Sequence, residues 1–247
     1  MNVNQYLDST YLKTPEQAGI SEKETEQIVV DLVNEAIENN FKLVMIRPNF
    51  VSMAKKMIAD AGADVVVGTV IGFHEGTATV VEKLEEAEKA IKDGVDELDY
   101  VVNYEAFKNE QINLVKGEVF KGTKIGLDNG KVVKWIIEIA ALTNEEIVGL
   151  TQLIRDVVVE NFTEEQAKEV FVKSSTGFYK REDGGPVGAT FEGMELICEN
   201  AKPLQAKAAG GVRSYEDAVK MLEMGVTRLG TSSAKKIADG KTASEGY

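Results

Sequence analysis

Short apolar runs alternate with amphipathic stretches along this chain. The runs are rich in β-branched and aromatic residues, which is typical of buried strands. The stretches between them place apolar residues at helical spacing, and the first begins with a Ser-x-x-Glu capping box at Ser21 and Glu24. The predicted strands are 6–10, 43–46, 64–71, 97–102, 134–139, 170–174, 204–208 and 227–230, and the predicted helices include 21–39, 79–93, 144–160 and 214–224.

Strands that alternate with helices are expected to be parallel and joined by right-handed crossovers. Eight such units fit a (β/α)₈ TIM barrel better than an open doubly wound sheet, although the alternation alone is compatible with both. The length of 247 residues suits one barrel. Because no low-complexity linker interrupts the chain, we expect a single domain over residues 1–247.

Two segments fit the alternation less well. Residues 114–129 contain Gly117, Gly122 and Gly126 and have weak periodicity, which predicts a broken helix. Residues 179–190 are polar and follow the strand at 170–174, which predicts a long loop. Function in α/β barrels is found in the loops at the carboxyl ends of the strands, so this loop is expected to border the site.

Composition narrows the function classes. The net charge of -13 argues against general binding to nucleic acid or to an anionic membrane. No apolar run approaches the ~20 residues of a membrane span, and the polar start of the chain is not a signal peptide, so a cytoplasmic location is expected. One cysteine, Cys198, and one histidine, His74, cannot form a disulfide framework or a zinc site rich in these residues.

Two lysines end two of the predicted strands. Lys173 closes a run of valines and phenylalanine, and Lys207 closes the run before Gly210. A buried ammonium is costly unless it is paired or neutralised, and a neutral lysine is a nucleophile. Burial and a nearby cation both lower a lysine pKa, so Lys207 on the next strand would activate Lys173. The alternative is a strand-end lysine whose ammonium lies in water.

An aspartate on the fourth predicted strand is a candidate partner for these lysines. Asp99 points to the same side of the strand as Glu97 and away from Leu98 and Tyr100. On the inner face of a barrel, such a carboxylate needs a cation, and it could then move protons through a bound water. A structural ion pair is the alternative.

Two turns near the end of the chain have the composition of phosphate-binding loops. One contains Gly210 and Gly211, and the other contains Ser232 and Ser233. Glycine lets the backbone approach an anion, and N–H groups at a helix start bind it. Phosphate sites after the seventh and eighth strands are frequent in barrels. His74 is read as a residue of a surface loop rather than of the site.

These motifs together resemble the deoxyribose-phosphate aldolase family. They are Val-Lys-Ser-Ser-Thr-Gly-Phe at Lys173, Ala-Lys-Ala-Ala-Gly-Gly-Val-Arg at Lys207 and Asp-Glu-Leu-Asp-Tyr-Val-Val at Asp99. The segments 7–13, 70–73, 134–138 and 230–233 support the resemblance, which therefore covers essentially the whole chain. The sequence departs from the family at 73–76, where it reads Phe-His-Glu-Gly instead of Phe-Pro-His-Gly, and in the longer loop at 179–190.

The resemblance implies a barrel that reversibly cleaves 2-deoxy-D-ribose 5-phosphate to D-glyceraldehyde 3-phosphate and acetaldehyde, with no metal or other cofactor. By resemblance, Lys173 forms the Schiff base, Lys207 tunes its pKa, and Asp99 works with Lys207 in proton transfer. The matching substrate and phosphate positions are Asp8, Thr10, Gly177, Gly210, Gly211, Ser232 and Ser233.

The resemblance also bears on the C-terminus and on partners. Some family members end in a mobile tail whose last tyrosine assists proton transfer, and this chain has a tail at 240–247 that ends in Tyr247. A homodimer and a small phosphorylated sugar are the partners it implies, with neither nucleic acid nor membrane. Two other functions stay open from the residues: a transaldolase-like lysine aldolase, and a phosphate-binding barrel that uses its lysines only to hold anions.

Overall fold

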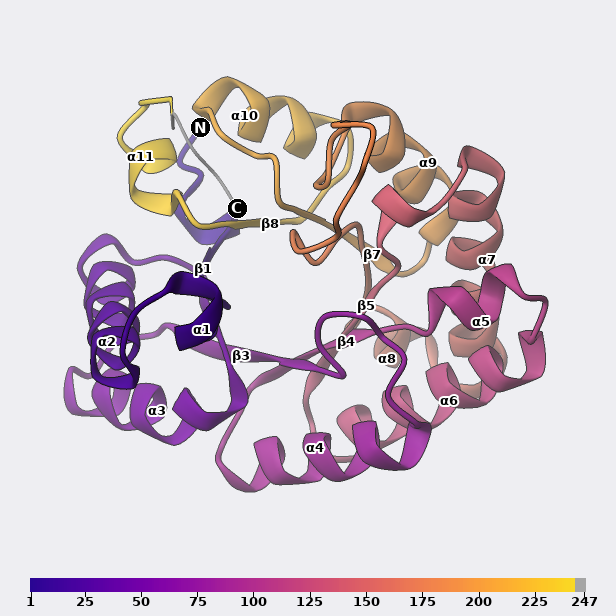
Figure 1. Cartoon of the computed structure of the whole chain (residues 1–247), viewed down its shortest axis with the longest axis horizontal. Coiled ribbons are helices and arrows are strands. Elements are labelled where there is room, and N and C mark those ends of the chain that lie inside the picture. Colours follow the sequence, from indigo (N-terminus) through magenta and orange to yellow (C-terminus); the bar gives the residue numbers. More distant parts are fainter. Residues whose placement is uncertain (243–247) are drawn as a thin grey trace.

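A computed structural model describes residues 1–242 of the chain. Its eight parallel strands pair in sequence order, and β8 returns to pair with β1, so the barrel is closed. The helices form a ring around the strands (Figure 1). The single-domain (β/α)₈ barrel expected from the sequence is therefore confirmed.

The strands are β1 (Leu7–Thr10), β2 (Leu43–Ile46), β3 (Val66–Ile71), β4 (Glu97–Val101), β5 (Val132–Ile136), β6 (Val170–Lys173), β7 (Gln205–Ala209) and β8 (Arg228–Thr231). The helices are α1 (Pro15–Ala18), α2 (Glu22–Asn39), α3 (Val51–Asp60), α4 (Val80–Lys92), α5 (Tyr104–Lys108), α6 (Ile112–Asp128), α7 (Asn144–Asn161), α8 (Glu164–Ala167), α9 (Phe191–Ala201), α10 (Tyr215–Glu223) and α11 (Ala234–Ala238). Three short 3₁₀ turns are η1 (Asn4–Tyr6), η2 (Pro48–Phe50) and η3 (Ile139–Ala141).

The fifth strand ends earlier than the sequence predicts. We expected residues 134–139, but β5 covers Val132–Ile136. The apolar run does continue, and the N–H groups of Ile137 and Ile139 still bond to the end of β6. Glu138 between them has a left-handed backbone, with φ 56°, which breaks the pleat and begins η3.

Residues 114–129 form an unbroken helix, so the prediction of a broken one is wrong. Two of the glycines face the barrel, where a Cβ atom on Gly122 would lie 2.8 Å from the Trp135 ring and one on Gly126 would collide with Val133. The missing side chains let α6 lie close against β5. Tertiary packing therefore overrides the weak helix propensity of glycine.

Side-chain caps explain where several helices begin. Ser21, Thr79 and Thr143 each accept a hydrogen bond from the backbone three residues on, and a glutamate at that position bonds back to the cap. These reciprocal bonds satisfy N–H groups that a helix leaves free at its start. The capping box predicted at Ser21 is thus present.

The interior has two layers of different character. Between strands and helices the core is apolar, and Trp135 stacks on Tyr100 with ring centroids 4.8 Å apart. Inside the barrel, β2 and β3 contribute a separate apolar cluster of Leu43, Met45 and Val70. The remaining strands contribute charged side chains to the centre. Within residues 1–242, no helix is long and apolar enough to cross a membrane.

Candidate active site

Charged side chains fill the part of the barrel that the apolar cluster leaves. All are at most 6% exposed. They come from β1 and from β4 to β8, and they are the cations Lys134, Lys173, Lys207 and Arg228 and the carboxylates Asp8, Glu97 and Asp99. The barrel centre therefore holds one cation more than it holds carboxylates.

Asp99 lies at the centre of this ionic network. Its Oδ2 atom accepts hydrogen bonds from Lys173 Nζ at 2.8 Å and from Lys207 Nζ at 2.9 Å, and its Oδ1 atom accepts one from Lys134 Nζ at 2.7 Å. Burial raises the pKa of Asp99, but the charges of the lysines outweigh burial and hold that pKa well below its ordinary value. Asp99 is therefore a permanent anion.

The structure brings together the two lysines and the aspartate that the sequence singles out. Lys173 and Lys207 are directly opposite each other in the pairing of β6 with β7. The predicted direction of β4 is also observed, because Glu97 and Asp99 face the barrel interior while Leu98 and Tyr100 belong to the outer core.

The other carboxylates complete the network on its far side from Lys173. Asp8 lies 2.5 Å from Lys207 Nζ and 2.6 Å from Arg228 Nη2. Glu97 lies 3.0 Å from Arg228 Nη1 and also pairs with Lys134. Lys134, Lys207 and Arg228 thus contact two carboxylates each, whereas the one ion pair of Lys173 in the described structure is with Asp99.

The number of carboxylate partners affects the pKa of each lysine: among the described residues, Lys173 has one such partner and Lys134 has two. Burial lowers the pKa of Lys173, Asp99 raises it, and Lys207 lowers it again, so the pKa falls to about 8. Burial also lowers the pKa of Lys134, but the negative charges of Asp99 and Glu97 outweigh burial and raise that pKa above its ordinary value. Lys173 therefore becomes a neutral nucleophile more readily than Lys134 does.

Three glycines predicted at the phosphate end lie in the loops after β6 and β7. Gly177, Gly210 and Gly211 have φ values of 82°, 70° and 74°, a region that other residues rarely adopt. A Cβ atom on Gly210 would lie 3.7 Å from Gly177 Cα, so the two loops lie side by side.

The remaining predicted residues occupy the ends of β1 and β8. Ser232 and Ser233 follow β8 and precede α11, as expected. Thr10 ends β1, and its hydroxyl donates to Asp8 O at 2.9 Å. Tyr247 lies outside the described residues.

The long loop at 179–190 contains no helix or strand, as predicted. Its end packs on the loop after β7: Ala189 N donates to Ala209 O and Gly210 O at 3.0 Å each. A Cβ atom on Gly188 would lie 2.5 Å from Gly210 C. Gly188 is thus a part of this end that the sequence analysis missed, because the contact joins two loops far apart in the chain.

A cavity of about 700 Å³ opens at the carboxyl ends of the strands. His74 lines it together with Tyr104 and with Phe178, on which the imidazole stacks at 5.6 Å. Lys13 and Lys180 add positive charge to its wall. Burial lowers the pKa of His74, and the nearby cations Arg47 and Lys180 lower it further, so the ring is neutral near pH 7.

Lys134 and Arg228 were not predicted as site residues. The available signal was a charged residue inside an apolar strand, as in Val133-Lys134-Trp135 and Thr227-Arg228-Leu229. That signal does not say which way the side chain points. Only the register of all the strands places both residues at the barrel centre.

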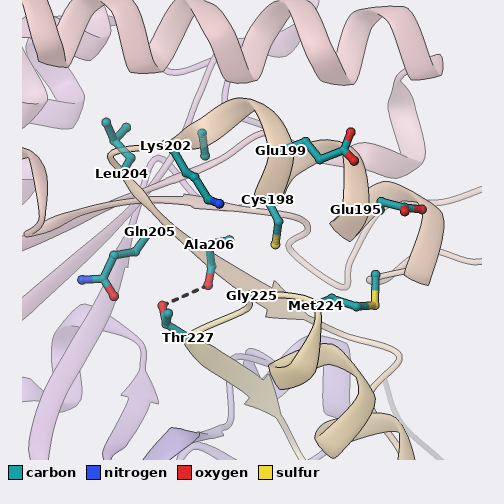
Figure 2. Close-up of a pocket in the computed structure, with 11 residues that line it drawn as sticks. Glu195, Cys198, Glu199, Lys202, Leu204, Gln205, Ala206, Met224, Gly225 and Thr227 are labelled. Carbon is teal, nitrogen blue, oxygen red and sulfur yellow. Dashed lines mark hydrogen bonds between the residues drawn. The ribbon is translucent and has the colours of Figure 1, made fainter.

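A second cavity, of about 400 Å³, lies at the opposite end of the barrel (Figure 2). It is lined by the end of α9 and the starts of β7 and β8, where Thr227 Oγ1 donates to Ala206 O at 3.3 Å. Cys198 borders it, and burial raises the pKa of that thiol to about 11, which makes it unreactive near neutral pH. Catalysis in barrels occurs at the other end, so this cavity is not the active site.

Comparison with known proteins finds relatives over nearly the whole length of the chain. No family model matches the chain. The deoxyribose-phosphate aldolase of Staphylococcus haemolyticus is 38% identical over 248 aligned positions, which cover 100% of both chains. That of Thermococcus kodakarensis is 37% identical over 239 positions and 96% of both chains.

Solved structures of aldolases have the same fold. A protein described as "QR15, an Aldolase" is 32% identical, with a TM-score of 0.79 over 97% of this chain and 95% of its own. The tetrameric deoxyribose phosphate aldolase of Aeropyrum pernix is 29% identical, with a TM-score of 0.76 over 96% and 89%. The chain therefore belongs to the deoxyribose-phosphate aldolase family and is a carbon–carbon lyase acting on 2-deoxy-D-ribose 5-phosphate.

Proposed function

We propose that Lys173 performs this cleavage by forming a Schiff base with C1 of the sugar. One observation supports this assignment above the others. Four buried cations face three buried carboxylates, and Lys173 has the fewest carboxylate contacts. Loss of a proton from Lys173 balances the charge of the barrel centre, so the folded protein itself favours the neutral amine.

The reaction follows from that neutral amine. Lys173 Nζ attacks the C1 aldehyde, and the adduct loses water to give a protonated iminium. A base removes the C3 hydroxyl proton, the C2–C3 bond breaks, and its electrons move to the iminium nitrogen. Glyceraldehyde 3-phosphate leaves, and an enamine remains. Protonation at C2 and hydrolysis then release acetaldehyde and the free lysine.

Asp99 and Lys207 would support these steps in different ways. The carboxylate of Asp99 lies 2.8 Å from Lys173 Nζ, where it stabilises the iminium charge. Its low pKa makes it a weak base on its own. We therefore assign the proton transfers to the Lys207–Asp99 pair acting through a bound water, and protonation of the enamine carbon to Tyr247 by analogy with the family.

The sugar phosphate would lie at the loops that follow β6, β7 and β8. The loops that carry Gly177, Gly210, Gly211, Ser232 and Ser233 would form this site despite the negative net charge of the chain. Gly210 N and Ser233 N already donate to Gly230 O and Thr231 Oγ1, so the N–H groups of Gly177, Gly211 and Ser232 would bind the anion. Thr10, the last residue of β1, would contact the sugar. Asp8 is fully buried between Lys207 and Arg228 and would act on the sugar only through Lys207. We further propose a homodimer that works in the cytoplasm; the tetrameric relative supports assembly of copies.

Trapping with borohydride tests the proposal. Reduction in the presence of 2-deoxy-D-ribose 5-phosphate should leave an adduct on Lys173, detected by peptide mass spectrometry. Acetaldehyde release should be the same with and without a chelator, and ketose phosphates should not be cleaved. Turnover that persists without any adduct on Lys173, and that survives Lys173→Ala, would contradict the assignment.

The pH dependence of the reaction follows from the nucleophile. Because the pKa of Lys173 is lowered to about 8, the protonated, inactive amine dominates below that pH. We expect kcat/KM to rise about tenfold per pH unit up to pH 8 and to level off above it. Initial rates between pH 6.5 and 10 measure this. A profile that is flat through pH 8 would show that another group limits the reaction.

Lys207→Met should move that profile to higher pH. The substitution removes the cation that lowers the pKa of Lys173, and Asp99 loses a competing partner. With three cations and three carboxylates left, Lys173 stays protonated. We expect the inflection to move toward pH 10, so that activity at pH 7 falls by about one to two orders of magnitude more than activity at pH 10. Loss of the proton transfer assigned to Lys207 should lower activity at every pH as well. An inflection that stays at pH 8 would show that Lys207 does not lower the pKa of Lys173.

A further inference from the structure

Glu138 is a buried carboxyl group that the proposed mechanism does not use. It lies two residues after the end of β5 and is 1% exposed. Its Oε2 atom accepts hydrogen bonds from Thr176 N, at 3.1 Å, and from Thr176 Oγ1. Its Oε1 atom is buried and has no hydrogen-bond partner among residues 1–242. Such an atom is unfavourable in a protein interior, so a reason for it is needed.

The backbone on both sides of Glu138 is bonded to the end of β6. Ile137 N donates to Lys173 O at 3.0 Å, and Ile139 N donates to Ser174 O at 2.9 Å. Between them, Glu138 has a φ of 56°, which is uncommon for a residue other than glycine. Such a conformation persists where the surrounding structure imposes it, and this occurs often at functional sites.

Thr176 connects Glu138 to the turn at Gly177 through the hydrogen bonds of its hydroxyl group. Its hydroxyl donates to Glu138 and accepts a hydrogen bond from Phe178 N at 3.0 Å, so the turn around Gly177 is fixed on both sides. On the β7 side, Ser174 Oγ accepts from Ala209 N at 3.0 Å. The segment between Lys173 and Gly177 is thus held by β7 at its start and by Glu138 at its end.

Stability alone does not account for a carboxyl group at this position. No cation contacts Glu138 in the described structure, and a buried charge without a paired cation is costly. Burial raises its pKa to about 7, against the lowering effects of the bonds from Thr176 and of the more distant charge of Lys173. A neutral acceptor would satisfy Thr176 at lower cost, but a carboxylate makes stronger and better-directed bonds.

We propose that Glu138 is a positioning residue that sets the distance between Lys173 and the phosphate end at Gly177. The proposal rests on the function proposed above, in which the sugar is attached at Lys173 while its phosphate is bound at Gly177. The distance between Lys173 and Gly177 must then match the distance between C1 and the phosphate of one substrate molecule. Misplacement by about 1 Å can reduce the rate of an enzyme about 10²-fold.

Two substrates separate this role from a purely structural one. Both 2-deoxy-D-ribose 5-phosphate and 2-deoxy-D-ribose would react at Lys173, but only the first uses the phosphate end. The ratio of their kcat/KM values therefore reports how well the two ends are aligned. Loss of folded protein lowers both values equally and leaves the ratio unchanged.

We expect Glu138→Ala and Thr176→Val each to lower this ratio by about tenfold or more. Glu138→Gln should give a ratio between those of the wild type and Glu138→Ala, because its amide oxygen can accept both bonds from Thr176 but, as a neutral acceptor, holds them more weakly. Thr123→Val is the matched control: it also removes a buried threonine hydroxyl, which accepts from Trp135 Nε1, but it lies on α6 outside the barrel. That control should leave the ratio unchanged.

Each outcome of this experiment decides the proposal. An unchanged ratio in folded Glu138→Ala and Thr176→Val would overturn it, and Thr176→Val decides alone if Glu138→Ala does not fold. A drop in Thr123→Val as large as that in Thr176→Val would also overturn it. A wild type without activity on either substrate would instead contradict the proposed function.

Discussion

Lys173→Met should fold into a protein that is inactive and more stable than the wild type. The substitution removes the nucleophile, so cleavage should fall by about 10⁴-fold or more. It also removes the unmatched cation and leaves three cations with three carboxylates at the barrel centre. Methionine has nearly the shape of lysine, so little packing is lost.

The gain in stability can be bounded from the pKa of the lysine. A pKa lowered from 10.5 to about 8 corresponds to about 3 kcal/mol against the protonated amine in the folded state. Since this pKa is below that of the unfolded chain, the penalty is full below pH 8 and disappears as the pH approaches 10.5. We expect the variant to gain about 1–3 kcal/mol at pH 7 and less at pH 10.

Urea denaturation at the two pH values measures this difference, and an assay for acetaldehyde measures activity. A variant that is less stable than the wild type at pH 7 would mean that Lys173 stabilises the network. Its pKa would then not be lowered by the fold. Equal gains at both pH values would point to improved packing instead of relief of charge.

Asp99→Asn should have the second large effect, and in this case stability falls together with activity. Both carboxylate oxygens accept hydrogen bonds from lysines. In asparagine one of them becomes an NH₂ group, which is a donor facing ammonium donors. Four cations would remain with two carboxylates, and breaking a buried ion pair in this way costs about 3–5 kcal/mol.

We expect a melting temperature that is lower by roughly 10 °C and a loss of about 10²–10⁴-fold in kcat. Differential scanning calorimetry and steady-state assays measure these effects. Asp60→Asn is the control, because Asp60 pairs with Lys56 in an exposed position on α3, where an ion pair contributes little. Equal changes in the two variants would show that burial of the network is not what matters.

The double variant Asp99→Asn/Lys173→Met tests the charge count directly. It has three cations with two carboxylates, so it should be more stable than Asp99→Asn alone. The two substitutions lie in contact, and their effects should not add. Additive effects would mean that Lys173 and Asp99 do not depend on each other for their charge.

The fold was predictable because the signal for each strand is local. The run at 43–46 coincides with β2, and the other predicted strands lie within two or three residues of those observed. The failures depend on contacts between elements. The end of β5 is set by the backbone of Glu138, and α6 is continuous because its glycines pack against Trp135 and Val133. Neither contact can be read from one segment.

The site was only partly predictable, for a related reason. Lys173, Lys207 and Asp99 stand in motifs specific enough to be recognised along the chain. The partners that fix their charge, Lys134 and Arg228, have no such motif. They become site residues only when strand pairing turns them toward the same centre. The burial and the imbalance of charge around Lys173 are properties of the closed barrel.

The ionic half of the barrel interior also affects how the protein responds to temperature. Barrels usually fill their centre with valine, isoleucine and leucine, and exposing such residues on unfolding raises the heat capacity. Exposing charged groups lowers it, so this protein should have a smaller heat-capacity change and a flatter stability curve than an apolar barrel of equal length. Hydration of charges also becomes less favourable on heating. The charged side chains of this network therefore make the centre of the barrel relatively stronger as temperature rises, while the apolar layer outside it weakens on cooling.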